Sequence, residues 1–481
     1  MILDGDTAVT GPTLDALFRR AGVRTPQAPA LCDPPNRESF TDGAVRKLNF
    51  AEADRAISRF AARLHALGLK ADAVVAIQLP NTVDAVIALL GVLRAGMIAA
   101  PLPLLWRQQD IVAALREVGA KAIVSCARAG AFEPVKTAVL AAAELFPIRH
   151  VCAFGQALPD GVVPLDDVFE PSDKLVHAAA RPGAAAAHVA IVTFEVAAGG
   201  VVPMARHAGH LIAAGAHACE AAGLAEGATI LSAIPPASFA GIALAVVPWL
   251  MSGGTLALHH GFDADAFDAQ TETLSDAALI LPGPALAPLA EAGRLLSLKT
   301  LIAVWRAPER LAASAPWYRA ARLVDVCAFG EAGLSAAPRG ADGRAAALTA
   351  AGAALDIART RAGTLALRGA MVPARSFPSA QPLSADGFLD TGYSCTAEGD
   401  AVTVTAAPAG LAAVGGYRFA QRGLDALLAA IDPTAAVMTV PDGLLGERLA
   451  GRSADPETLC AALRAHGANP LIADAFRLRA A

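Results

Sequence analysis

The strongest constraint on the fold is an alternation of two hydrophobic periods between residues 49 and 126. Apolar residues recur at helical spacing over 50–64, where Asn49 and Glu52 resemble an N-terminal capping box and Gly68 is suited to end the helix. Residues 71–80 predict a buried strand, followed by a helix (82–96), a strand (98–103), a helix (107–119) and a strand (120–126). This alternation predicts an α/β fold with parallel strands.

The same alternation returns after residue 185 and changes after about residue 360. Strands are expected at 188–194 and 228–235, and helices at 210–223 and 241–254. Short β-like runs with turns then follow at 363–369, 387–395 and 400–406, and a small α/β unit begins at Gly410. We therefore expect a large N-terminal domain of stacked α/β sheets (1–405), with a β-rich part at about 350–405. A small C-terminal α/β domain is expected over 406–481.

Composition narrows the class of protein. Of the 481 residues, 55% are hydrophobic and 17% charged, which excludes a disordered chain, and a net charge of -5 gives no electrostatic case for nucleic-acid binding. Residues 230–258 carry no charge over more than the length of a membrane span, but three prolines and a glycine pair break the segment, so we expect no membrane span. Seven cysteines without a CxxC pair and an acidic N-terminus predict reduced thiols in a cytoplasmic protein.

Several ordered landmarks carry a resemblance to a known family. They are the run over 48–106, IPPASFAGIALAVVPWLMSGGTL at 234–256, VDVCAFGEAGL at 324–334, GTLALRG with DGFLDTGY at 363–393, and AVGGYRF at 413–419. Together they resemble the acyl-CoA synthetase branch of the adenylate-forming, or AMP-binding, enzymes. The resemblance implies that ATP activates a carboxylic acid as an acyl-adenylate, from which the thiol of coenzyme A then displaces AMP. It also implies ATP or AMP, magnesium and CoA as cofactors, a small carboxylic acid or acyl-CoA as partner, and a setting in fatty acid metabolism.

The resemblance also assigns candidate site residues. Glu331 stands where the family has a magnesium-binding, catalytic glutamate, and Gly410 stands at the hinge between the domains. The substrate pocket is expected near Ser238, Phe239 and Gly241. The positions expected to contact the nucleotide or CoA are Thr193, Gly199, Gly200, Ala307, Ala328, Gly330, Tyr393, Gly415, Gly416 and Tyr417.

The stretch that matches the family's phosphate-binding loop, residues 195–204, lacks that loop's chemistry. Val196, Ala197 and Ala198 replace hydroxyl residues, no lysine is present, and Glu195 adds a negative charge. Several charge-assisted hydrogen bonds, each worth roughly 1.5–3 kcal/mol, are therefore missing together. Two interpretations remain: a cradle of backbone N–H groups around Gly199, or a tight strand–helix turn that binds no ligand.

Other family positions are also replaced. Trp305 and Arg306 stand for two glycines beside the adenine, where they would fill the pocket or Trp305 would stack on a base. Tyr393 stands for the aspartate that grips the ribose, and the last lysine is Lys299, far from the family's C-terminal catalytic lysine. We therefore expect an acid–CoA ligase homologue whose ATP-dependent activation is weak or lost. The alternative is a pseudoenzyme that binds acyl or CoA groups or acts as an interaction scaffold.

Overall fold

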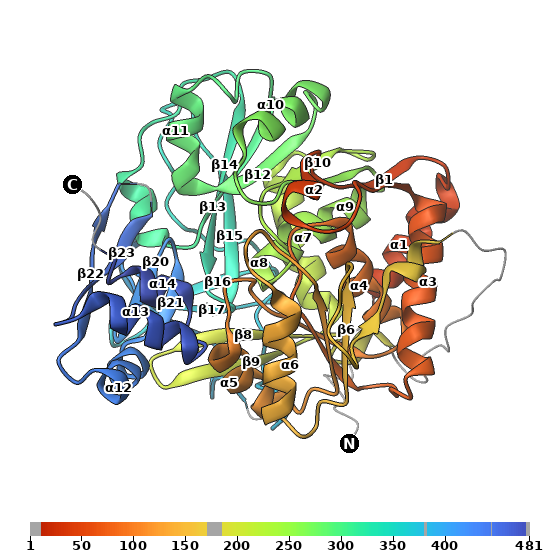
Figure 1. Cartoon of the computed structure of the whole chain (residues 1–481). Coiled ribbons are helices and arrows are strands. Elements are labelled where there is room, and N and C mark those ends of the chain that lie inside the picture. The colour runs from red at the N-terminus through yellow and green to blue at the C-terminus, as the bar shows by residue number, and fades with distance from the viewer. Residues whose placement is uncertain (1–10, 171–184, 380–381, 444, 478–481) are drawn as a thin grey trace.

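The computed structural model describes residues 11–170, 185–379, 382–443 and 445–477, which form two large sheets, a smaller sheet and a C-terminal unit (Figure 1). The mixed α/β architecture with a small C-terminal α/β part confirms the predicted fold class. The capping box at the start of helix α3 (Phe50–Ala66) also forms, since the Asn49 side chain accepts from the Glu52 amide at 2.8 Å.

The first large sheet contains the alternating strands of the N-terminal region. Its strands pair in parallel except at one edge, where the last two are antiparallel. Their spatial order is β7 (Val163–Pro164), β6 (His150–Phe154), β5 (Ala122–Cys126), β3 (Val74–Ile77), β4 (Ile98–Pro101), β8 (Ile191–Ala197) and β9 (Gly200–Arg206). Helix α3 precedes β3, and the helices that connect the following strands are α4 (Val83–Arg94), α5 (Gln108–Val118) and α6 (Pro134–Glu144).

The second large sheet has a parallel centre and antiparallel edges. Its spatial order is β15 (Gly333–Pro338), β14 (Arg322–Phe329), β13 (Thr300–Trp305), β12 (Ala278–Pro282), β10 (Ile230–Ser232), β11 (Leu256–Leu258), β1 (Pro29–Cys32) and β2 (Lys47–Asn49). The associated helices are α1 (Leu14–Arg24), α2 (Arg37–Phe40), α7 (Ala208–Ala222), α8 (Phe239–Gly241), α9 (Val247–Ser252), α10 (Ala264–Thr273) and α11 (Leu286–Glu291).

The uncharged segment 230–258 lies in the core of this part of the molecule. It forms β10, a helical stretch from α8 through a π-helical turn to α9, and β11. Trp249 is fully buried beside Phe18 and Phe50, and its indole N–H donates to the Gly254 carbonyl at 3.0 Å. In the described residues, no helix is both long and apolar enough to cross a membrane. The segment is hydrophobic because it packs between layers.

The β-rich part and the small C-terminal unit follow. The four-stranded sheet is β16 (Asp356–Arg359), β17 (Thr364–Arg368), β18 (Leu389–Glu398) and β19 (Ala401–Ala406). The C-terminal unit consists of β20 (Leu411–Val414), β21 (Tyr417–Ala420), α12 (Gln421–Ile431), β22 (Ala436–Asp442), β23 (Gly446–Arg452), α13 (Pro456–Ala465) and α14 (Pro470–Asp474). Gly410, with φ of 74°, falls in the connection between β19 and β20. The predicted boundary between residues 405 and 406 falls at the end of β19, and the division into two domains stays a prediction. Rotation of the small domain about Gly410 stays a prediction.

The stretch that resembles a phosphate loop is a β-hairpin. Strands β8 and β9 pair along their whole length, with Ala197 opposite Gly200, so only Ala198 and Gly199 remain in the turn. The expected strand–helix turn is therefore wrong, because β9 intervenes before α7. The β-branched residues Val201 and Val202 favour a second strand. Hairpin pairing also commits backbone N–H groups that a phosphate cradle would need.

Candidate functional site

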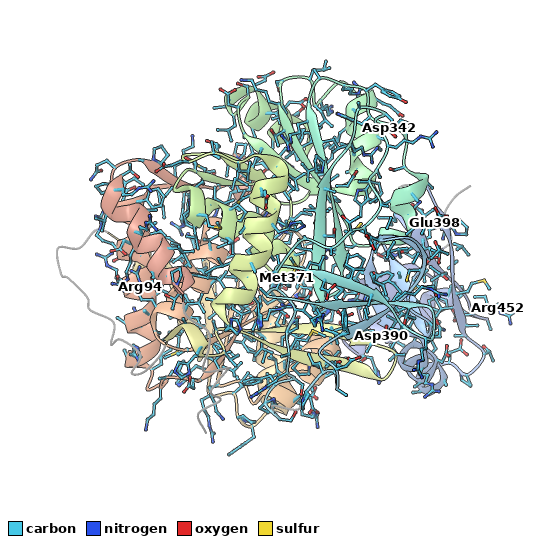
Figure 2. All side chains as sticks on the ribbon, turned by 180° about the vertical axis from the view of Figure 1, so that it is seen from behind. Arg94, Asp342, Met371, Asp390, Glu398 and Arg452 are labelled. Atoms are coloured by element: carbon cyan, nitrogen blue, oxygen red, sulfur yellow. The ribbon has the colours of Figure 1, made fainter. Side chains whose placement is uncertain are left out.

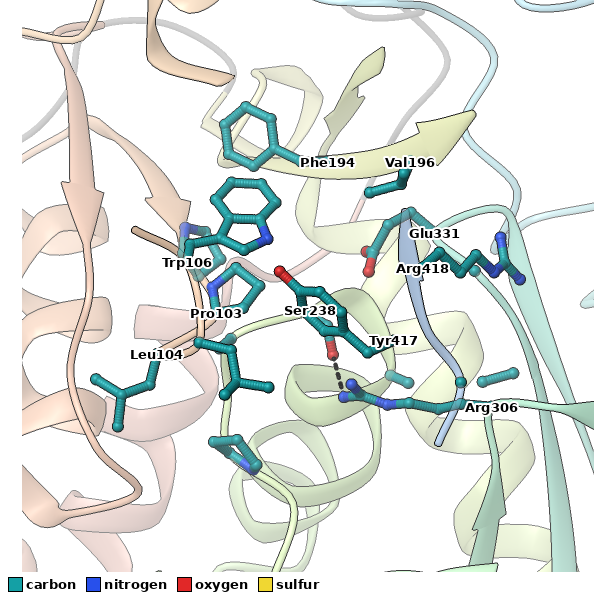
Figure 3. Close-up of a pocket in the computed structure, with 18 of the residues that line it drawn as sticks. Pro103, Leu104, Trp106, Phe194, Val196, Ser238, Arg306, Glu331, Tyr417 and Arg418 are labelled. Carbon is teal, nitrogen blue, oxygen red and sulfur yellow. Dashed lines mark hydrogen bonds between the residues drawn. The ribbon is translucent and has the colours of Figure 1, made fainter. Parts of the chain in front are cut away.

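A cavity of about 230 Å³ lies between the large domain and the hairpin β20–β21 of the small unit (Figure 3). The hairpin β8–β9, the segment after β4 and the start of α8 form its other walls. The lining residues are Leu79, Pro80, Asn81, Pro101, Pro103, Leu104, Leu105, Trp106, Phe194, Glu195, Val196, Pro235, Ala237, Ser238, Ala240, His260, Arg306, Ala328, Gly330, Glu331, Gly416, Tyr417 and Arg418.

One side of the cavity is aromatic. The rings of Trp106 and Phe194 pack at 5.7 Å between centroids, and the Tyr417 ring reaches toward them from the small unit (Figure 3). The Tyr417 hydroxyl accepts from the Asn469 amide at 3.0 Å, and the same amide donates to the Leu105 carbonyl at 3.1 Å. Asn469 therefore fixes the tyrosine against the large domain.

Polar groups face the cavity from the opposite side. The Arg306 guanidinium donates to the Ser238 hydroxyl at 3.2 Å, the bond drawn in Figure 3. No carboxylate of the described residues lies within ion-pair distance of Arg306, and burial lowers the pKa of its guanidinium. At another edge, His260 accepts from the Asn81 amide at 3.3 Å, and burial lowers the pKa of its imidazole to about 4. His260 is therefore neutral at physiological pH.

Glu331 is held at the mouth of the cavity by backbone contacts. Its carboxylate accepts from the Phe239 amide at 2.8 Å, which fixes the side chain at the start of α8. The backbone carbonyl of Glu331 accepts a hydrogen bond from the guanidinium of Arg206, which is fully buried. Arg206 also donates to the Thr193 hydroxyl at 3.0 Å and to the carbonyl of Met371, which is labelled in Figure 2. Burial lowers the pKa of Arg206 to about 10, which leaves it charged. Arg206 thus holds the backbone of Glu331 in place, and the Glu331 carboxylate acts electrostatically on both Arg206 and Arg306.

Glu195, the residue that adds a negative charge to the phosphate-loop stretch, pairs with Arg418 from β21. The two side chains form an ion pair in which Arg418 is 9% exposed and Glu195 15%. Glu195 also accepts a hydrogen bond from the Glu331 backbone amide. Burial raises the pKa of the Glu195 carboxyl, and the charge of Arg418 opposes that rise. The pair joins the hairpin of the large domain to the small unit.

Tyr393 continues this set of contacts. Its ring is 1% exposed, and its hydroxyl accepts from Arg418 and donates to the Arg306 carbonyl at 3.2 Å. Burial raises the pKa of the phenol, so it stays protonated. A continuous set of bonds therefore links residues from four separate elements. We call it the Arg418 network; its members are Glu195, Arg418, Tyr393 and Arg306.

Two glycines allow this close approach. Gly330 has φ of 56°, and a Cβ there would overlap the Glu195 carboxylate. Gly416, with φ of 79° in the turn between β20 and β21, would overlap the Arg306 backbone and Cβ in the same way. Both positions require glycine for conformation and for space.

The structure brings together part of the predicted site. The predicted residues that line the cavity are Ser238, Ala328, Gly330, Glu331, Gly416 and Tyr417. The others lie elsewhere. Thr193 is buried against Arg206, Phe239 lies under Arg206, and Tyr393 is in the core. Gly199 and Gly200 are at the β8–β9 turn, and Gly415 forms the β20–β21 turn together with Gly416. Ala307 precedes a short helix, Gly241 packs on the Pro235 carbonyl, and Gly410 lies against Ala198.

Trp305 does not occupy the cavity. Its indole packs over Gly283, and its N–H donates to the Asp325 carboxylate at 2.8 Å. Trp305 is thus buried away from this cavity, and the two interpretations offered for it, filling the adenine pocket and stacking on a base, stay predictions. Since successive side chains of a strand point to opposite faces, Trp305 at the end of β13 enters the core while Arg306 turns to the cavity.

No pattern in the sequence indicated the aromatic wall, which is formed by the rings of Trp106, Phe194 and Tyr417. Trp106 lies in the loop after β4 and Phe194 lies in the middle of β8, and their rings meet because β4 pairs with β8. Arg418 follows the predicted site residues Gly416 and Tyr417, but nothing in the sequence indicated Glu195 as its partner.

No group of three or more His, Cys, Asp or Glu side chains suited to hold a metal occurs among the residues that the structure places. Glu331 as a single magnesium ligand stays a prediction. All seven cysteines are free thiols.

Comparison with known proteins finds a matching protein family for part of the chain and solved structures with a similar fold. Residues 18–194 match the family described as AMP-binding enzyme. Among solved structures, the fold is similar to that of the amide bond synthetase McbA from Marinactinospora thermotolerans, at a TM-score of 0.74 and 20% identity, over 95% of this chain and 94% of that one. It is also similar to MbtA from Mycobacterium smegmatis, at a TM-score of 0.68 and 20% identity, over 96% and 90% of the two chains.

A third similar structure is o-succinylbenzoate CoA synthetase (MenE) from Bacillus subtilis, at a TM-score of 0.71 and 15% identity, covering 93% of this chain and 91% of that one. Such identities establish the shared fold of adenylate-forming enzymes. A curated relative, the salicyl-AMP ligase / salicyl-S-ArCP synthetase of Mycobacterium tuberculosis, is 37% identical over 89 residues, which span 18% of this chain and only 15% of the relative. Residues 18–194 thus match the AMP-binding enzyme family, and the chain as a whole shares the fold of these solved structures.

Proposed function

We propose that this chain binds a small carboxylic acid in the adenylate-forming fold and does not activate it with ATP. The observation that carries the proposal is the Arg418 network. The resemblance places nucleotide contacts at three of its positions, Glu195, Arg306 and Tyr393. Glu195 and Tyr393 are both bonded to Arg418, and the Tyr393 hydroxyl donates to the Arg306 carbonyl. The place of a nucleotide is thus taken by side chains of the protein.

The charged residues of the Arg418 network disfavour the binding of a triphosphate. An incoming phosphate would meet the Glu195 carboxylate, and Arg418 is already committed to that carboxylate and to Tyr393. Removing one partner from a buried ion pair costs roughly 3–5 kcal/mol, which a phosphate would have to offset. The residues present therefore do not fit ATP with magnesium, and no adenylation step is proposed for this chain.

The remaining cavity suits an acyl or aryl group. Its walls are mostly apolar, as is usual for sites that bind small molecules. Two of the compared proteins carry an aromatic acyl group in their names, salicyl and o-succinylbenzoate. CoA is not part of the proposal, because Gly416 packs on Arg306 and Tyr417 is fixed by Asn469 where a pantetheine arm would pass. The free cysteines fit the cytoplasmic location that we include in this proposal.

The second candidate function is that of an acid–CoA ligase. Glu331 favours it, since its side chain lies at the cavity where a magnesium ligand is expected. ATP–pyrophosphate exchange with a panel of benzoic and short aliphatic acids separates the two functions. We expect no exchange above the protein-free background. Acid-dependent exchange that is abolished by Glu331→Gln would establish the ligase and refute the proposal.

A further inference from the structure

The small C-terminal unit is bonded to the large domain at two separate places. The first is the ion pair of Arg418 in β21 with Glu195 in β8. The second is Asn469, 1% exposed just before α14, whose side-chain amide donates to the Leu105 carbonyl at 3.1 Å. We call these contacts the Arg418 latch and the Asn469 latch. Because they start from different elements of the small unit, a rotation of that unit must break both.

The Asn469 latch lies in an interface from which water is excluded. Its amide nitrogen also contacts the Asp110 carboxylate at 3.4 Å and donates to the Tyr417 hydroxyl at 3.0 Å. Its amide oxygen accepts from the Leu471 N–H at 3.1 Å. Burial raises the pKa of the Asp110 carboxyl and of the Tyr417 phenol. Hydrogen bonds in such a dry interface are stronger than the same bonds in water, so this latch resists opening.

The two surfaces also approach each other closely at three glycines of the small unit. A Cβ on Gly416 would overlap Arg306, and a Cβ on Gly446 would overlap the Arg310 side chain. At Gly467, a Cβ would lie 3.0 Å from the Cβ of Gln108. The three glycines lie in the β20–β21 turn, at the start of β23 and after α13. The backbone of the small unit therefore packs on the large domain at points that are far apart in the sequence.

The connection that would act as a hinge is packed as well. The Gly410 carbonyl accepts from the Gln421 amide at 2.9 Å, and a Cβ at Gly410 would lie 3.1 Å from that of Ala198. Pro408, whose φ is fixed by its ring, lies against Gly392. The predicted hinge thus contacts α12, the β8–β9 turn and β18.

We infer that the Arg418 latch and the Asn469 latch hold the small unit in one orientation, and that the unit does not rotate about Gly410. The cavity then keeps the wall formed by β20–β21 whether or not a ligand is bound. This inference goes beyond the proposed function, because it holds for any ligand of the cavity and with or without ATP.

The test measures the distance between spin labels on Arg116→Cys in α5 and Arg422→Cys in α12, both exposed positions. Cys32→Ser and Cys219→Ser remove the two half-buried thiols from the full chain, and the other five cysteines are buried. Double electron–electron resonance should give one narrow distance distribution. Two or more distances in this chain, with both latches intact, would overturn the inference. Labels on Arg20→Cys and Arg116→Cys, both in the large domain, are the matched control.

Removing the latches is the second arm of the test. Glu195→Ala with Arg418→Ala removes the first latch without leaving a buried charge, and Asn469→Ala removes the second. In the triple variant, the share of molecules in other orientations should rise at least about tenfold, the scale of one lost charge-assisted hydrogen bond. A second or broader distance should therefore appear between the labels on α5 and α12, while the control pair stays narrow.

Circular dichroism and the melting temperature establish that the triple variant is folded. Asn469→Ala alone, which keeps the ion pair, serves if the triple variant does not fold, and it should broaden the same distribution to a smaller extent. An unchanged narrow distribution in a folded latch variant would refute the role of the latches.

Discussion

The region between the large domain and the small unit has two halves, which differ in whether side chains of the protein fill the space. The half between α8 and the rings of Trp106 and Phe194 is open; our proposal places the acid there, and we call it the acid half. In the other half, where the resemblance places the nucleotide, residues of the Arg418 network bond to one another. We call it the nucleotide half, and the proposal is that these residues occupy the place of a nucleotide.

The residues that differ from the family's motifs make physical sense only when they are considered together. Taken singly, Glu195 is an unfavourable charge and Tyr393 is a weak substitute for an aspartate. Taken together, Arg418 satisfies both residues, and Gly330 provides the space for the carboxylate. Because these side chains satisfy one another's charges and hydrogen bonds, the region is stably packed although the family's motif residues are absent.

The largest expected effect comes from breaking the network at its centre. Arg418→Met leaves Glu195 charged, buried and unpaired, which should lower the free energy of unfolding by about 3 kcal/mol or more. The double variant Arg418→Met with Glu195→Leu removes both charges and should recover most of that loss. Urea unfolding measures each value.

Arg422→Met is the matched control, because Arg422 is exposed on α12. It should change the stability by less than about 0.5 kcal/mol. If Arg418→Met is no more destabilising than this control, the nucleotide half is not held together as described, and the difference between the two halves disappears.

A smaller effect is expected from removing the space that admits Glu195. Gly330→Ala places a Cβ against the carboxylate in a left-handed conformation and should cost about 2 kcal/mol. Gly199→Ala, in the hairpin turn, meets nothing within 4 Å and has no positive φ to strain, so it should be nearly neutral. Thermal unfolding of Gly330→Ala and Gly199→Ala under the same conditions measures the difference. Equal melting temperatures would contradict the close packing of Gly330 against Glu195.

The smallest effect concerns the acid half, where His260 is kept neutral. Its pKa is lowered to about 4, below the unfolded value near 6.5, so the unfolded chain binds the extra proton first. The stabilisation due to neutral His260 is complete above pH 6.5 and is lost as pH falls toward 4. Wild type should lose about 1 kcal/mol more than His260→Gln between pH 7.5 and 5.5. Parallel loss in both proteins would show that His260 is solvated.

The fold could be predicted from the sequence to a large extent. Helix α3 combines apolar spacing with the Asn49 cap, so local and tertiary preferences agree there. The uncharged segment through Trp249 was assigned correctly because proline and glycine break it. The hairpin β8–β9 was not predicted, although Val201 and Val202 favour a strand, because the resemblance placed a phosphate-binding loop at these residues.

The site could be predicted less well. Glu331 and Tyr417 reach the cavity as the resemblance implied, since both follow recognisable runs. The pairing of Glu195 with Arg418 joins residues far apart in the chain, and periodicity carries no information about such a contact. Trp305 and Arg306 differ in environment only through the direction of adjacent side chains at a strand end, which the sequence does not specify.

The proposal above all requires that the protein itself occupies the nucleotide half. Calorimetric titration of the full chain with ATP and magnesium, and separately with AMP, measures whether a nucleotide still binds there. We expect no measurable heat of binding for either nucleotide up to millimolar concentration. Micromolar affinity for ATP or AMP would contradict it.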